Sequence, residues 1–135
     1  MRSERAASSR RTPLLLLLCL SAASCAADPP VDVVAELRIT PAAPIVGQET
    51  SVELTLKDRF DRPVRVTSLQ LEGHMEHPGM APVVVEASEQ ADGRYSAGMT
   101  FTMAGDWVVF ARGALVSGGT RMRIEVGRVS VRGTS

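Results

Sequence analysis

The chain has 135 residues, and its 15 Lys and Arg balance its 15 Asp and Glu, so the formal net charge at pH 7 is zero. This balance gives no reason to expect a nucleic-acid partner. The two cysteines are Cys19 and Cys25, so no internal disulfide can form after residue 25 and the domain depends on an apolar core. Roughly 100 residues remain for that core, which is enough for one domain.

Residues 1–24 have the composition of a secretion signal. Arginines at positions 2, 5, 10 and 11 precede an apolar run from Leu14 to Leu20, and small residues follow at 21–24. The apolar run is far shorter than the roughly 18 to 20 residues that a membrane-spanning helix needs, so a stable transmembrane anchor is not expected. The sequence therefore predicts a signal peptide and export of the protein.

Cys25 directly follows these small residues, and this arrangement resembles the lipobox of bacterial lipoproteins. The resemblance implies that Cys25 carries a lipid and holds the protein at the periplasmic or outer face of a membrane. Ala22 stands where that motif usually has leucine, and cleavage after Ala27 would instead give a freely secreted protein. Residues 25–33 are expected to form a flexible tether in either case.

Short runs of apolar and β-branched residues, separated by Gly, Pro and Asp, occupy the rest of the chain. They predict strands at 35–40, 51–57, 64–71, 83–87, 94–103, 107–115 and 121–131. No amphipathic helical pattern accompanies them. About seven strands of this spacing predict an all-β fold, an immunoglobulin-like antiparallel β-sandwich over residues 34–132. Trp107, the single tryptophan, is expected to anchor its core.

Both histidines of the chain and two of its methionines lie between residues 74 and 80. Imidazole and thioether groups are ligands for soft metal ions such as Cu(I). Pro78 and Gly79 suit the two central positions of a type II turn, which would bring His77 and Met80 within about 7 Å of each other. The sequence thus places a nitrogen donor and a sulfur donor side by side.

Strand directions bring a further methionine toward this loop. If the strand 64–71 runs upward, the strand 94–103 also ends at the top, so Met103 lies beside the loop. Met99 is roughly 13 Å lower, at about 3.3 Å per residue, and is assigned to the core. We therefore predict a metal site whose ligands are His74, Met75, His77, Met80 and Met103.

Two alternatives to a metal site remain open at this point. The loop can equally be a solvated turn whose methionines pack on the end of the sandwich, since methionine commonly fills gaps. Met103 can equally be a core residue, because the two-residue alternation of its strand places it on the same face as the buried residues. Because histidine must be neutral to bind a metal, a genuine site should weaken below about pH 6.5.

The stretch from Leu71 to Val126 resembles the YtkA-like domain, which is related to FixH proteins. The resemblance rests on the His and Met loop, on Gly93-Arg94-Tyr95, and on the segment Phe-Thr-Met-Ala-Gly-Asp-Trp at 101–107. It implies an exported β-sandwich that takes part in copper handling and in the assembly of respiratory oxidases.

Two functions from different classes follow. The first is a metal-handling module that binds Cu(I) for storage or for delivery to an envelope protein or an oxidase assembly factor. The second is a non-catalytic interaction module of the cell envelope without a metal. An enzyme is not expected, because no nucleophile motif or paired carboxylates accompany the histidines.

Overall fold

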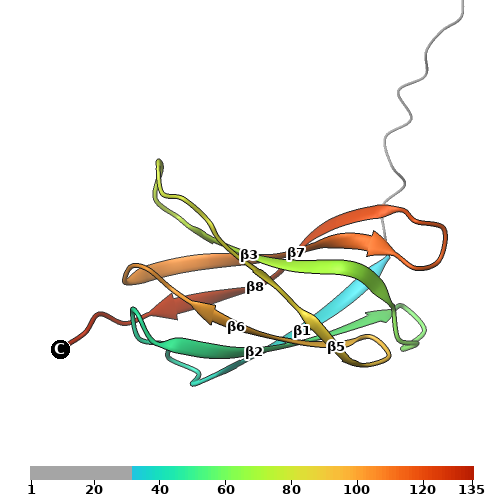
Figure 1. Cartoon of the computed structure of the whole chain (residues 1–135), viewed down its shortest axis with the longest axis horizontal. Helices are drawn as coiled ribbons and strands as arrows, with labels where there is room; N and C mark the ends of the chain where they lie inside the picture. Colours follow the sequence, from blue (N-terminus) through green and yellow to red (C-terminus); the bar gives the residue numbers. More distant parts are fainter. Residues whose placement is uncertain (1–31) are drawn as a thin grey trace, which may run out of the picture.

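The computed structural model describes residues 32–135 (Figure 1). The expected signal peptide, the expected lipidation site Cys25 and nearly all of the expected tether lie outside the described residues. Within them the chain forms eight strands and no helix. The prediction of an all-β fold is confirmed.

The strands form two antiparallel four-stranded sheets. The first sheet has the order β1 (Val33–Thr40), β2 (Glu49–Asp58), β6 (Arg94–Thr100), β5 (Ser88–Ala91). The second has the order β4 (Val83–Glu86), β3 (Val66–Met75), β7 (Gly105–Leu115), β8 (Arg121–Val131). This is the order of an immunoglobulin constant-type sandwich with β4 added beside β3.

The eighth strand arises where the chain passes from one sheet to the other. β4 pairs with β3 in the second sheet, and β5 begins two residues after β4 ends but pairs with β6 in the first sheet. The sequence did not predict β5 because all four of its residues are exposed. An edge strand without a buried face has no alternation of apolar and polar residues to detect.

Two strand ends differ from the prediction in ways that affect the candidate site. β3 continues to Met75, so His74 and Met75 belong to a strand and pair with Val108 and Trp107 of β7. β6 ends at Thr100, so Met103 lies in the connection between β6 and β7. The loop that follows β3 therefore begins at Glu76.

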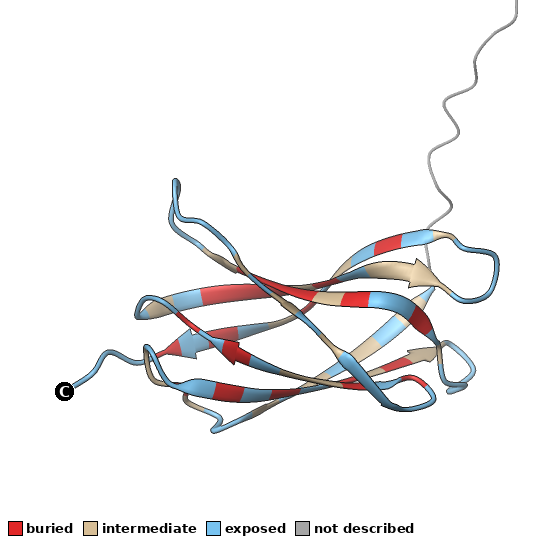
Figure 2. Ribbon diagram, viewed as in Figure 1, coloured by how far each residue is buried: buried red, intermediate tan, exposed pale blue. Residues whose placement is uncertain are grey.

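The core lies between the two sheets, where inward-facing residues of both meet (Figure 2). Val52, Leu54 and Leu56 of β2 are each at most 1% exposed, as expected from their two-residue period. Trp107 and Phe101 are completely buried and meet edge to face, with ring centroids 5.3 Å apart. Burial of each such side chain contributes about 1.5–3 kcal/mol.

Candidate metal site at the end of the sandwich

The loop after β3 has the turn geometry that its sequence predicts. Pro78 and Gly79 form the turn, and Gly79 has a φ of +86°. A type II turn requires a positive φ at its third position, where glycine is tolerated without steric cost. His77 and Met80 consequently flank the turn.

The connection between β6 and β7 faces this loop. Its backbone is tied to the core, because Trp107 Nε1 donates a hydrogen bond to the carbonyl oxygen of Met103 at 3.1 Å. Gly105 has a φ of +133°, and a Cβ atom there would lie only 2.7 Å from Met75 Cε. Met75 can thus occupy its position because residue 105 has no side chain.

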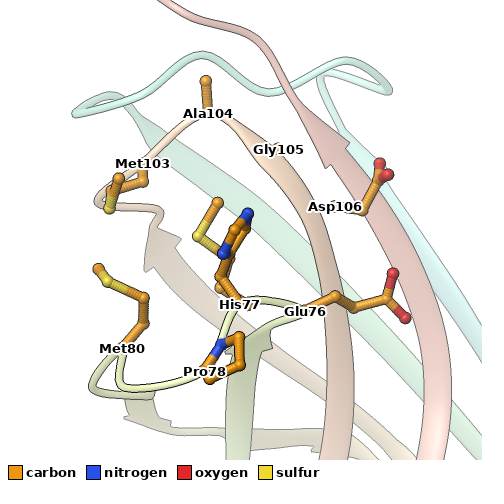
Figure 3. Close-up of a pocket in the computed structure, with 9 residues that line it drawn as sticks. Glu76, His77, Pro78, Met80, Met103, Ala104, Gly105 and Asp106 are labelled. Atoms are coloured by element: carbon orange, nitrogen blue, oxygen red, sulfur yellow. The ribbon is translucent and has the colours of Figure 1, made fainter.

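These two segments enclose a cavity of about 620 Å³, which we call the rim cavity. Its lining residues are Met75, Glu76, His77, Pro78, Met80, Met103, Ala104, Gly105 and Asp106. Figure 3 shows the side chains of His77, Met80 and Met103 directed into the same space. Met80 and Met103 are 40% and 42% exposed, so this space is open to solvent. Met99, in contrast, is completely buried in the core.

The two carboxylates of the rim cavity are engaged elsewhere. Glu76 forms an ion pair with Arg128, and Asp106 Oδ1 accepts a hydrogen bond from Ser130 Oγ at 2.6 Å. Both carboxylates point away from the sulfur atoms of Met80 and Met103 (Figure 3). The free donors of the cavity are therefore thioethers and one imidazole.

His74 does not lie in the rim cavity. Consecutive strand residues point to opposite faces of a sheet, so His74 faces outward while Met75 faces inward. His74 Nε2 lies 3.2 Å from Glu72 Oε2 and 3.4 Å from Arg123 Nη2, and its ring contacts Phe110 edge to face. Of the five predicted ligands, the structure brings together Met75, His77, Met80 and Met103, and it separates His74 from them.

The outer-face neighbours of His74 form a charged cluster that sequence reasoning missed. Glu72 is only 6% exposed, and its carboxylate accepts a hydrogen bond from Arg123 Nε at 3.2 Å and forms an ion pair with Arg112 Nε at 3.1 Å. Burial alone would raise the pKa of Glu72, but hydrogen bonds from His74 and Arg123 and the charges of both arginines outweigh it, so the pKa is lowered. Residues so distant in sequence become neighbours only through the strand register.

Within residues 32–135, no three His, Cys, Asp or Glu side chains gather closely enough to hold a metal ion. The same residues contain no helix long and apolar enough to cross a membrane.

Comparisons with solved structures agree with this fold. The chain is similar to the Lin-41 filamin domain, with a TM-score of 0.51 and 15% identity over 73% of this chain and 91% of that domain. It is also similar to FdeC, an Escherichia coli adhesin, with a TM-score of 0.53 and 22% identity over 73% of this chain. The chain spans about a third of the adhesin, 32% of its length. The prediction of an immunoglobulin-like sandwich is confirmed.

No curated protein matches the chain. The family model described as YtkA-like matches residues 31–111, which is more than half of the chain. The match includes every residue that lines the rim cavity. The resemblance carried by the His and Met loop and by the 101–107 segment is thereby confirmed, and the chain belongs to the YtkA-like family.

Proposed function

We propose that this protein is a non-catalytic β-sandwich module that binds one Cu(I) ion in the rim cavity. The observation that supports the proposal is the shared position of three thioethers and one imidazole, from Met75, Met80, Met103 and His77, around one cavity. Soft sulfur donors select Cu(I), and imidazole is a good additional ligand. His74 is not part of the proposed ligand set, because it contacts Glu72 on the opposite face of β3.

The surroundings of these donors favour a soft ion over a hard one. Ca²⁺ and Mg²⁺ need several oxygen ligands, and the carboxylates of Glu76 and Asp106 are held by Arg128 and Ser130. Met80 and Met103 remain about two-fifths exposed, so a partner could reach a bound ion. We therefore favour storage or delivery of Cu(I) to an envelope protein or an oxidase assembly factor.

We also propose where in the cell the protein acts. An exported protein anchored by a lipid at Cys25 would hold the rim cavity near partners in the same membrane. This part of the proposal rests on residues 1–25 of the sequence, and mass spectrometry of the mature N-terminus tests it. A diacylated Cys25 would support the anchor, and an unmodified N-terminus at Asp28 would refute it.

A Cu(I) competition titration against a chromophoric chelator, under anaerobic and reducing conditions, tests the metal site. We expect one equivalent of Cu(I) to bind the parent protein and none to bind the double variant His77→Ala/Met80→Ala. His74→Ala is the matched control, because it removes an imidazole outside the rim cavity and should titrate like the parent. A double variant that titrates like the parent refutes the proposal.

A non-metal interaction module is the second candidate. The observation that favours it is the exposure of Met80 and Met103 at one end of the sandwich, since flexible thioethers suit adaptable protein contacts. In that case the parent protein would bind no Cu(I), and capture of a partner would be unaffected by chelators.

A further inference from the structure

A second groove lies at the other end of the same sheet. β3 and β7 lose their regular register between Thr67 and Gln70, and the resulting bulge adjoins a groove of about 570 Å³. Thr67 is eight residues from Met75 along β3, or roughly 26 Å at 3.3 Å per residue. The groove is thus independent of the rim cavity.

Three arginines line this groove. They are Arg112 on β7 and Arg121 and Arg123 on β8. Arg112 and Arg123 are direct cross-strand partners, and Arg121 lies on the same outward face, two residues before Arg123. Like charges placed directly opposite one another are destabilising unless something compensates them.

The positive charges of the three arginines are only partly compensated. Glu72 is the carboxylate that pairs with this cluster, and it binds Arg112 and Arg123 through their Nε atoms. Among residues 32–135, Arg121 forms no ion pair. Three positive charges against one negative charge leave a local excess of +2. An anion in the groove would reduce this repulsion.

The backbone beside the arginines is unusual as well. Ser68 has a φ of +52°, which non-glycine residues rarely adopt, and it lines the groove together with Thr67. Bulges and strained residues are concentrated at binding sites, where they redirect side chains. Here the bulge places Thr67 and Ser68 in the lining of the same groove as the arginines, and the Thr67 hydroxyl donates a hydrogen bond to the carbonyl oxygen of Ala114 at 3.2 Å.

We propose that this arginine groove binds an oxyanion of the phosphate or carboxylate class. Guanidinium groups offer paired N–H donors that match the oxygens of such anions. Arg121 is the principal ligand because, within residues 32–135, no carboxylate is paired with it. Arg112 Nη2 donates to Gln70 Oε1 and Arg123 Nη2 lies near His74 Nε2, so the donors that these half-exposed arginines offer in the described part of the chain are their Nη1 groups. Glu72 opposes binding electrostatically while it holds two of the arginines in place.

Titration of the full protein with inorganic phosphate, and separately with succinate, tests the proposal. The readout is the NMR signals of the arginine Nε–Hε groups, with sodium chloride at equal ionic strength as the reference. We expect saturable shifts of the signals of the groove arginines in the parent protein. Arg121→Ala should bind the anion about tenfold more weakly, which is the effect of losing one charge-assisted hydrogen bond. Glu72→Gln should bind the anion more tightly. Saturation by phosphate or by succinate identifies the class of anion.

Arg38→Ala is the matched control, because it removes an equal charge from the outer face of β1 in the other sheet and should bind like the parent. The proposal is overturned if the NMR shifts saturate with neither phosphate nor succinate. It is also overturned if the shifts match those that sodium chloride produces at the same ionic strength. Equal affinities of Arg121→Ala and Arg38→Ala also overturn it.

Discussion

Trp107 donates a hydrogen bond from its indole Nε1 to the carbonyl oxygen of Met103 at 3.1 Å. Trp107 is the largest fully buried side chain in the described part of the chain, and Met103 is 42% exposed at the edge of the rim cavity. This bond therefore couples the packing of the core to the position of a proposed ligand. It also explains how a methionine in a connection, rather than a strand, can have a defined position.

Replacing Trp107 by Phe should weaken both stability and Cu(I) binding. Loss of the hydrogen bond costs about 0.5–1.5 kcal/mol, and the smaller ring leaves a core cavity that adds to this cost. Val52→Ala is the control. It also creates a cavity in the core, but it leaves the hydrogen bond between Trp107 and Met103 in place. Urea denaturation and Cu(I) titration of both variants would show whether only Trp107→Phe lowers the affinity; equal affinities would contradict the coupling.

Met80→Leu and Met103→Leu should each lower Cu(I) affinity about tenfold or more, which corresponds to a loss of about 1.4 kcal/mol or more of binding free energy. Leucine has a similar volume but no sulfur, so the cost to folding stability should stay below about 1.5 kcal/mol. Met99→Leu removes a thioether from the core and should leave the affinity unchanged. A Met99→Leu variant as weak as the other two would show that the sulfur atoms act through stability rather than ligation.

Gly105→Ala should displace Met75. A Cβ atom at residue 105 would lie 2.7 Å from Met75 Cε, and a φ of +133° strains any residue with a side chain by about 1–3 kcal/mol. Gly118→Ala is the control, because its φ of +87° is also positive but its Cβ would meet no atom within 4 Å. Both variants should lower the melting temperature, and Gly105→Ala alone should lower Cu(I) affinity.

Glu72→Gln should remove part of the acid sensitivity of folding. The lowered pKa of Glu72 means that its ionised form is stabilised in the folded state. This stabilisation is fully present above the ordinary carboxyl pKa of about 4.3 and is lost as the pH falls through the lowered folded value. The variant should be about 1–2 kcal/mol less stable at pH 7, since two half-exposed arginines lose a charged acceptor. Urea denaturation from pH 7 to 3 should show that the difference in unfolding free energy between the parent protein and the variant shrinks. A difference that stays constant over this range would contradict the prediction.

Thr50→Val should stabilise the protein. Thr50 is 1% exposed, and within the described residues its Oγ1 is a buried side-chain atom without a hydrogen-bond partner. Valine has the same shape without the hydroxyl, so about 1 kcal/mol of desolvation cost is avoided. Thr100→Val, at an exposed position of β6, should change stability little. Thermal denaturation of the two variants measures the contrast.

The periodicity of short strands could be predicted from the sequence because one buried face imposes a two-residue alternation. Val52, Leu54 and Leu56 follow this rule and lie in the core. The turn at Pro78 and Gly79 was also predictable, because its backbone angles are local properties of those residues. β5 was not predictable, because an exposed edge strand has no such alternation.

The sequence by itself determined that soft donors are concentrated between residues 74 and 80 and that the fold is a β-sandwich. Only the tertiary structure decided which donors meet. Pairing with β7 extends β3 to Met75, and this places His74 and Met75 on opposite faces of the sheet. The same register brings Glu72 to Arg112 and Arg123, and within residues 32–135 it leaves Arg121 without an ion-paired carboxylate. The alternation within a strand can be read from the sequence, but which outward-facing residues meet depends on how strands distant in sequence pair, and only the folded sheet shows this.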